Sequence, residues 1–432
     1  MKINATSIKK LFSISLLAIF FMASFICCSN GSNTPAATPT PTPTDQTSTD
    51  YPEITIPDSD VEDFIPTVSS VQMAKNMVIG WNLGNTLDAT DWNNAANAGL
   101  NTETGWGMPK TTEAMIIAVK NAGFKTIRIP ISWHNHISDT SNYKIDSSWM
   151  ARVKQIVDWA YNQDMYVIIN IHHDNLAESK LAGNCGFALS KKADIQAQSK
   201  AYIRNIWTQI AIEFASYGER LVFEVLNEPR DVDGEVTRNE WWTTDENIVS
   251  IITDYEQIGV NAIRSVKGNK NRFIMVPGYA ASGTAKAILD LYTMPTDTAT
   301  DKLILSTHAY SPNDFALSEN GKDTFDDSGK SDLDYIFGFL KSDYVNKGIG
   351  VVMGEASATD RNNTNARIAW TTYYFTKARE AGIPVVLWDN MVTVSYKGKL
   401  GSGENHGYYD RNNNTWFFPE IMEAMMDAAY NR

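Results

Sequence analysis

Short apolar runs alternate with amphipathic stretches along most of the chain. β-Branched and other apolar residues predict eight strands, at Met77–Asn82, Thr126–Ile131, Tyr166–Ile171, Leu221–Leu226, Arg272–Val276, Leu303–Ser306, Gly350–Met353 and Val385–Trp388. Helical periodicity predicts helices at Thr112–Ala122, Met150–Gln163, Ala193–Tyr217, Ile248–Val266, Asp332–Tyr344, Thr364–Ala381 and Pro419–Tyr430. Near-continuous apolar strands with intervening helices favour an α/β fold in which eight units close into a (β/α)8 TIM barrel. A doubly wound open sheet is the alternative, but no glycine-rich phosphate loop follows the first strand.

The N-terminal segment has a different pattern from the rest of the chain. Three lysines precede the apolar run Leu11–Ile26, which is too short to span a bilayer comfortably, and Cys27 and Cys28 follow it. This arrangement predicts an export signal over residues 1–28, with lipidation of one of the two cysteines anchoring the protein to a membrane. An ordinary secretory signal peptide with incidental cysteines is the alternative.

Residues 29–66 are dominated by Thr, Pro, Ser, Ala and acidic residues, with Thr-Pro alternation between Thr38 and Thr44. Such a segment has little to bury and predicts an extended linker. The pattern of strands and helices then occupies residues 67–432 as a single domain. We expect an exported monomer that works outside the cell or on its surface, where it can meet a substrate too large to enter.

Composition excludes several classes of function. The 432 residues carry 37 Lys and Arg against 50 Asp and Glu, a net charge of −13 without a basic run, so nucleic-acid binding is not expected. Cys185 is the one thiol within 67–432, which rules out an internal disulfide or a cysteine-based metal site there. The chain is also rich in aromatic residues, with 12 Trp and 18 Tyr.

Polar and aromatic residues cluster at the ends of the predicted strands. In a parallel barrel the carboxyl ends of all strands meet at one rim, where the chemistry of such folds takes place. The candidates there are Asn85, Arg128, His172, His173, Asn227, Glu228, His308, Tyr310, Glu355 and Trp388. So many polar strand ends on one rim are not expected from packing alone.

Glu228 and Glu355 suggest a reaction, because cleavage of a glycosidic bond needs two carboxyl groups. One donates a proton to the leaving oxygen, and the other attacks or assists attack at the anomeric carbon. Arg128 and Tyr310 could hold Glu355 ionised, and His308 could relay or tune the proton of the acid.

The remaining candidates fit sugar recognition. Asn227 is placed to hydrogen-bond a sugar hydroxyl, and Trp388 offers a flat face for a pyranose ring.

The motifs at these strand ends resemble glycoside hydrolase family 5, a large family of retaining cellulases and related β-glycanases. The motifs are Gly80-Trp81-Asn82-Leu83-Gly84-Asn85, Thr126-Ile127-Arg128-Ile129-Pro130, Ile171-His172-His173, Leu226-Asn227-Glu228-Pro229, Thr307-His308-Ala309-Tyr310, Met353-Gly354-Glu355 and Leu387-Trp388-Asp389-Asn390. The resemblance implies that Glu228 is the general acid/base and Glu355 the nucleophile, with the other candidates binding substrate around them. It also implies retention of anomeric configuration, so we expect the two carboxyl groups roughly 5 Å apart.

Within the family, the pair Trp106-Gly107 and the stretches 403–407 and 410–412 are similar to the subfamily of endo-β-1,4-glucanases and xyloglucanases. The expected substrates are therefore β-1,4-glucans such as cellulose, mixed-linkage glucan and xyloglucan, cleaved without a cofactor. β-Mannanase or xylanase activity is the alternative within the enzyme class. His406 stands where many relatives carry an aliphatic residue or Phe, so this position is expected to bear on substrate preference.

Two different classes of function compete with this interpretation. His172, His173 and His308 could hold a metal ion in a metal-dependent hydrolase, although a carboxylate-pair mechanism needs no metal. The barrel could also be a non-catalytic glycan-binding domain, against which the presence of both carboxylates argues. His134 and His136 are expected at the surface or in supporting positions.

The tryptophans are expected to divide into two groups. Four in helical patterns should pack the core, namely Trp149, Trp159, Trp207 and Trp370. Five in or near loops should line a sugar-binding groove or anchor their loops, namely Trp92, Trp106, Trp241, Trp242 and Trp416.

Overall fold

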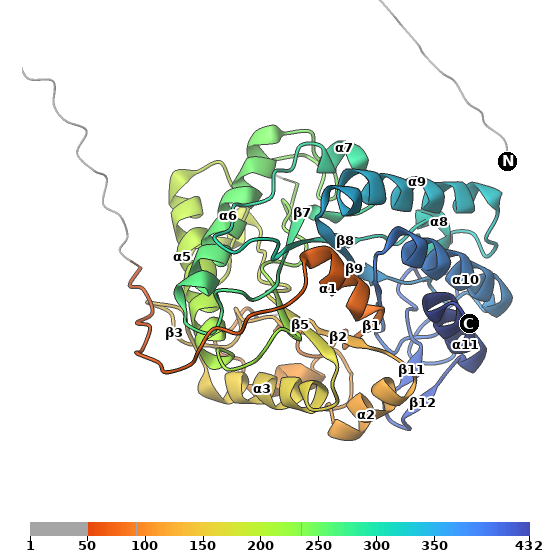
Figure 1. The fold of residues 1–432 in the computed structure, drawn as a ribbon, viewed down its shortest axis with the longest axis horizontal. Helices are drawn as coiled ribbons and strands as arrows, with labels where there is room; N and C mark the ends of the chain where they lie inside the picture. Colours follow the sequence, from red (N-terminus) through yellow and green to blue (C-terminus); the bar gives the residue numbers. More distant parts are fainter. Residues whose placement is uncertain (1–50, 92, 235) are drawn as a thin grey trace, which may run out of the picture. The chain divides into compact units, whose positions relative to one another are not determined.

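The computed structural model describes residues 51–432 except Trp92 and Glu235. Eight parallel strands form a closed barrel in the order β1-β10-β9-β8-β7-β6-β5-β2 (Figure 1), which confirms the predicted (β/α)8 TIM barrel and excludes the open sheet. The strands are β1 (Ile79–Asn82), β2 (Thr126–Ile129), β5 (Tyr166–Asn170), β6 (Leu221–Glu224), β7 (Ile274–Ser282), β8 (Leu303–His308), β9 (Gly350–Ala356) and β10 (Val385–Leu387). The export signal, the lipid anchor and the linker up to residue 50 lie outside the described residues and stay predictions.

Helices surround the barrel, as Figure 1 shows. The long ones are α2 (Glu113–Asn121), α3 (Ser147–Tyr161), α5 (Ala193–Glu213), α6 (Glu246–Ser265), α9 (Asp327–Asp343), α10 (Thr364–Ala381) and α11 (Pro419–Tyr430). Several begin at a residue whose side chain caps free backbone N–H groups: Asp146 accepts from Ser148 and Trp149 at the start of α3, and Asp245 accepts from Asn247 at the start of α6. None of the helices in the described part is long and apolar enough to cross a membrane.

Short elements complete the chain. They are α1 (Ser70–Met77), α4 (Glu178–Leu181), α7 (Lys286–Leu289), α8 (Asn313–Ala316), the 3₁₀ turns η1 (Leu100–Thr104) and η2 (Val345–Lys347), and the antiparallel hairpins β3 (Ile137–Asp139) with β4 (Lys144–Ile145) and β11 (Tyr409–Asp410) with β12 (Thr415–Trp416). The connection from β7 to β8 carries only the one-turn α7, in agreement with the lack of a helical pattern there.

Alternation along the strands separates two apolar layers. Ile168 and Val222 belong to a cluster inside the barrel, whereas the next residues, Ile169 and Phe223, belong to the larger cluster between strands and helices. This follows from the period of two in a strand. Helix α1 contributes Met73, Ala74 and Met77 to the inner cluster. The inner layer therefore fills the part of the barrel next to α1 with apolar side chains and leaves the carboxyl ends of the strands to polar ones.

Several predicted bounds are wrong. The first strand was expected from Met77, but α1 ends there and β1 begins at Ile79. The fifth and seventh strands were expected to end at Val276 and Met353, but β7 reaches Ser282 and β9 reaches Ala356. Both strands are longer than predicted because they pair again with β8 after an irregularity in the register. Ser282 of β7 pairs with His308, and His308 pairs with Glu355 of β9.

Residues 51–66 were expected to belong to the linker, but they contact the barrel. The carbonyl oxygens of Tyr51 and Pro52 accept hydrogen bonds from α5, and Asp63 accepts from the backbone N–H groups of Gly268 and Lys270. The boundary predicted at residue 67 is thus too late within the described chain. These hydrogen bonds join backbone groups to single side chains. They need no periodic pattern of apolar residues, so the sequence gives no sign of them.

Glu256 on α6 is a fully buried carboxyl group that receives a hydrogen bond from Tyr292. Burial raises the pKa of Glu256 well above its usual value, and the hydrogen bond from Tyr292 opposes this only in part. The folded protein therefore holds this proton to higher pH than the unfolded chain does, which lowers stability progressively as pH rises above the unfolded pKa of about 4.3.

Glu256→Gln is accordingly expected to raise the midpoint of thermal unfolding at pH 7 by about 2 °C or more. The difference should nearly vanish at about pH 3, because the wild-type carboxyl is then almost fully protonated in both states. Thermal unfolding followed by circular dichroism at the two pH values checks this. Glu423→Gln, an exposed change on α11, is the control and should show no such pH dependence. A stabilisation independent of pH would contradict the argument.

Candidate active site

A cavity of about 940 Å³ opens at the carboxyl ends of the strands. Nine of the ten predicted site residues line it: Asn85, His172, His173, Asn227, Glu228, His308, Tyr310, Glu355 and Trp388. The tenth, Arg128, is fully buried and contacts Glu355 and Asn227. The structure therefore brings together all of the residues that the strand-end pattern singled out.

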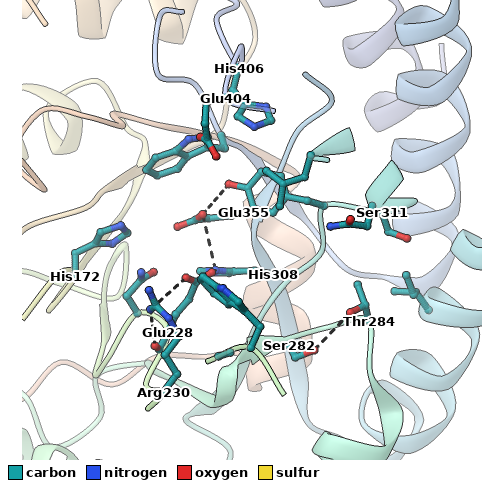
Figure 2. Close-up of a pocket in the computed structure, with 18 of the residues that line it drawn as sticks. His172, Glu228, Arg230, Ser282, Thr284, His308, Ser311, Glu355, Glu404 and His406 are labelled. Carbon is teal, nitrogen blue, oxygen red and sulfur yellow. Dashed lines mark hydrogen bonds and ion pairs between the residues drawn. The ribbon is translucent and has the colours of Figure 1, made fainter. Parts of the chain in front are cut away.

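Glu228 and Glu355 face each other across His308 (Figure 2). The His308 Nδ1 atom lies 2.8 Å from Oε1 of Glu228 and 3.8 Å from Oε2 of Glu355. One oxygen of each carboxylate and a ring nitrogen of His308 all lie within 4.8 Å of one another. This spacing agrees with the expected separation of roughly 5 Å and leaves less room than the ~6.5–9.5 Å needed when a water molecule sits between the carboxyl groups.

The proton of this pair is shared with His308. Burial disfavours the charged form of His308, but the carboxylates of Glu355 and Glu228 outweigh it and raise the pKa of His308. Burial in turn raises the pKa of Glu228, but the hydrogen bond and charge of His308 outweigh this and lower it. The proton is thus held between His308 Nδ1 and Glu228 Oε1, which lie 2.8 Å apart.

Glu355 is held by two groups from other strands. Arg128 on β2 donates from Nη1 to Oε1 of Glu355 at 2.8 Å, and the Tyr310 hydroxyl donates to Oε2 at 2.8 Å. Burial opposes the charge of Arg128, but Glu224 and Glu355 outweigh it and raise its pKa, so the guanidinium stays protonated. Both oxygens of Glu355 are therefore bound by donors, which fixes the position of the side chain.

Glu224 is a buried charge that the sequence analysis missed. It accepts from Nε of Arg128 at 2.7 Å, from Asn170 at 2.9 Å and from Ser306 at 2.6 Å, and it is fully buried inside the barrel. Arg128 also donates to Asn227, which orients that amide next to Glu228. The one signal of Glu224 in the sequence is a charged residue within an otherwise apolar strand.

Trp388 and His172 both line the cavity, and their rings stack as neighbours. Their rings are parallel within 1° and their centroids lie 6.0 Å apart. Gly84 makes room for Trp388, because a Cβ atom on Gly84 would lie 3.0 Å from the indole ring. Gly354 does the same for His308, whose Nε2 would be 3.0 Å from such an atom. The glycines in two of the motifs thus serve close packing around the site.

His172 and His173 are neutral side chains in this environment. Burial lowers the pKa of His173 to about 4 and that of His172 well below its usual value. The Nδ1 atom of His172 lies 3.0 Å from Nδ2 of Asn170, an amide nitrogen that can only donate, so Nε2 of His172 carries the proton. His172 therefore offers a hydrogen-bond donor.

Two groups of side chains offer the ligand atoms that a metal ion would need: Asp88 with His172 and His173, and Glu228 with His308 and Glu355. The Asp88 carboxylate already accepts from the backbone N–H groups of Asn85 and Thr86, and the second group is the carboxylate pair itself. The atoms that could bind a metal ion are thus largely engaged in hydrogen bonds. The geometry therefore favours hydrolysis by a carboxylate pair over metal-dependent hydrolysis.

The comparisons with known proteins agree with this geometry. Residues 89–393 match the model of the cellulase family, glycosyl hydrolase family 5. The chain belongs to glycosyl hydrolase family 5. It is 38% identical over 368 residues to endoglucanase A of Clostridium longisporum, covering 84% of this chain and 66% of that relative. It is 37% identical to endoglucanase B of Clostridium cellulovorans, covering 84% of this chain and 77% of that relative.

Solved structures of the family resemble this one closely. A broad-specificity endoglucanase from Ruminococcus champanellensis with bound cellotriose superposes with a TM-score of 0.76 at 38% identity, covering 84% of this chain and 99% of that one. A lichenase from Caldicellulosiruptor sp. F32 in complex with cellotetraose gives a TM-score of 0.75 at 36% identity, covering 87% and 99%. The family 5 barrel here is therefore the common catalytic fold of these enzymes.

This family 5 cleft also contains residues that were not predicted as part of the site. Arg230, Ser282, Thr284, Tyr335 and Glu404 line it. Ser282 ends β7 beyond the predicted end of that strand, and Glu404 lies in the stretch 403–407 noted for substrate preference. The other three stand on loops and on helix α9, where neither periodicity nor a motif singled them out. His406 lines the cleft as well, with Nδ1 2.9 Å from Oγ of Ser357, so its bearing on substrate preference stays a prediction.

The expectations for the other aromatic residues are met in part. Trp149, Trp207 and Trp370 are fully buried, whereas Trp159 is only partly buried against the core. Trp106 and Trp241 line the cleft, and Trp416 packs against the core. Trp242 is exposed, and Trp92 lies outside the described residues.

His134 and His136 are buried, so a surface position is wrong for both. His134 Nδ1 lies 2.6 Å from Asp174, whose carboxylate also accepts from the backbone of Trp133, and His136 stacks on Trp149 at 3.5 Å. These contacts give the two histidines supporting positions.

Proposed function

We propose that this family 5 protein is an endo-acting β-1,4-glucanase that retains the anomeric configuration. The observation that carries the proposal is the pair Glu228 and Glu355, with carboxylate oxygens within 4.8 Å of each other at the centre of the cleft. Carboxyl groups this close suit direct attack on the sugar by one of them. The endoglucanase names of the relatives, and the cellotriose and cellotetraose bound in the related structures, support a β-glucan substrate.

In the first step Glu228 protonates the glycosidic oxygen while Glu355 attacks the anomeric carbon. The bond from that carbon to the leaving oxygen breaks, and a bond to a carboxylate oxygen of Glu355 forms with inversion. Tyr310 and Arg128 hold Glu355 in place for this attack. The leaving chain departs as an alcohol that carries the proton from Glu228.

In the second step Glu228 is a carboxylate and acts as the base. It removes a proton from a water molecule, whose oxygen attacks the same carbon and displaces Glu355. Two inversions give net retention. Formation of the covalent intermediate neutralises the charge of Glu355, the largest of the effects that favour the charged form of His308. The histidine then loses that support, which helps Glu228 to keep the proton it takes from water.

Neutral polysaccharides suit this cleft. Trp106, Trp241, Tyr335 and Trp388 provide flat faces, and neutral histidines and amides provide hydrogen-bonding groups. β-Mannan and xylan offer similar rings, so they are the alternative substrates.

The purified fragment 51–432 assayed on carboxymethylcellulose, mixed-linkage glucan, xyloglucan, mannan and xylan tests the substrate class. We expect the highest activity on the β-1,4-glucans, with a rapid loss of viscosity that marks internal cleavage. Proton NMR of the first product from cellopentaose should show the β-anomer before mutarotation. Activity confined to mannan or xylan would contradict the glucanase assignment, and an initial α-anomer would contradict retention.

A further inference from the structure

Arg230 lies beside Glu228 at the edge of the cleft (Figure 2). Its Nη1 atom is 3.7 Å from Oε2 of Glu228 and donates to the carbonyl oxygen of the same residue at 3.1 Å. Its Nε atom donates to Glu240 at 2.9 Å, and its guanidinium carbon lies 4.2 Å from the centre of the Trp241 ring. One cation thus contacts the acid/base and an aromatic face of the rim.

The backbone around Arg230 is fixed from two sides. Its N–H donates to Oδ1 of Asn175 at 2.8 Å, and the carbonyl of Pro229 accepts from Ala280 at 2.9 Å. The Arg230 side chain is only 15% exposed. The cation is therefore held in a partly dry position, where its attraction for a carboxylate is stronger than at an open surface.

Trp241 differs from Arg230 in its exposure. The tryptophan is 52% exposed and lines the cleft, while the guanidinium covers part of its ring. The uncovered part is available to a flat sugar ring. Arg230 and Trp241 follow Glu228 on the same connection after β6, so this aromatic face lies near the group that protonates the leaving oxygen.

We propose that Arg230 is a positioning residue that couples Glu228 to a sugar platform for the leaving chain on Trp241. The inference rests on the proposed function, in which Glu228 is the acid/base. Negative charge develops on Glu228 as its proton passes to the leaving oxygen, and the adjacent cation stabilises that charge in the transition state. A sugar ring on Trp241 excludes water from the guanidinium and strengthens the effect.

Leaving-group dependence tests the coupling, because a good leaving group needs little help from the acid. For Arg230→Gln we expect kcat/KM on cellohexaose to fall about tenfold or more. The value on 2,4-dinitrophenyl β-cellobioside should fall far less. Arg220→Gln is the matched control: its guanidinium carbon also lies 4.2 Å from an aromatic ring, that of Tyr161, but outside the cleft. The control should change neither value.

The pH profile of kcat/KM distinguishes the effect of the Arg230 charge on Glu228 from the effect of the sugar platform on Trp241. The charge of Arg230 contributes to lowering the pKa of Glu228, so Arg230→Gln should move the alkaline limb to higher pH. Arg230→Lys keeps the positive charge but loses the flat guanidinium that packs on Trp241. Trp241→Ala keeps Arg230 but removes the sugar platform. Both variants should therefore leave the alkaline limb in place and raise KM for cellohexaose.

Equal losses on both substrates with an unmoved alkaline limb would overturn the coupling and leave Arg230 a structural role. A failure of the proposed function looks different: Glu228→Ala would then hydrolyse cellohexaose as fast as the wild type, whatever the Arg230 variants do.

Discussion

Glu355→Ala is expected to lower kcat on soluble β-glucan on the order of 10⁵-fold, the scale found when a covalent nucleophile is removed. The reason is that Glu355 supplies the carboxylate that attacks the anomeric carbon, held in place by donors from Arg128 and Tyr310. Binding of cellotetraose should be largely retained, because the aromatic faces and amides of the cleft remain. Hydrolysis rates and calorimetric titration of the variant measure the two quantities.

Azide distinguishes the roles of the two carboxyl groups. In Glu228→Ala the glycosyl-enzyme still forms from an activated aryl cellobioside, and azide attacks it from the face that water uses, which gives the β-glycosyl azide. In Glu355→Ala azide takes the place of the missing carboxylate and gives the α-glycosyl azide. Glu404→Gln changes a third carboxylate of the same cleft and is the control, expected to need no azide. Undiminished hydrolysis by either alanine variant would overturn the assignment.

Much of this site could be predicted because a parallel barrel gathers its strand ends at one rim. Glu228, Glu355 and Trp388 are far apart in the sequence, yet the order of the strands alone places them around one opening. Arg230 escaped prediction because it belongs to a loop whose path no periodic pattern describes. Trp241 on the same loop was expected to line a groove or to anchor its loop, and it lines the cleft.

The polar interior of the barrel escaped prediction for another reason. Glu224 occurs in a strand that is otherwise apolar, and its pairing with Arg128 joins positions 96 residues apart. Helix α1 was missed because its apolar residues merge in the sequence with those of β1. Glu224 and helix α1 are both explained by partners that only the folded chain brings near: Arg128 for Glu224, and the inner apolar cluster for α1.

Arg128→Met is expected to lower both stability and activity, because it leaves two carboxylates without their shared cation. Arg128 and Glu224 are fully buried, and removing one partner of a buried pair costs about 3–5 kcal/mol. Loss of the cation beside Glu355 should also lower kcat, because the nucleophile is then held by the Tyr310 hydroxyl without Arg128. Chemical unfolding and initial rates measure these effects. Arg272→Met removes another fully buried arginine, which donates to backbone carbonyls, and should lower stability but not kcat of the folded protein.

Glu224→Gln separates the two effects of Arg128. The amide nitrogen would face either the Ser306 hydroxyl, which must turn to accept, or the donors of Arg128 and Asn170, so this variant should also lose some stability. It keeps the contact between Arg128 and Glu355, however, and should retain far more of kcat than Arg128→Met. Since Arg128 and Glu224 contact each other directly, the double variant should lose less stability than the sum of the two, by about 2 kcal/mol. Strict additivity would show that Glu224 and Arg128 are not energetically coupled, and an equal loss of kcat in both single variants would place Glu224 in the reaction itself.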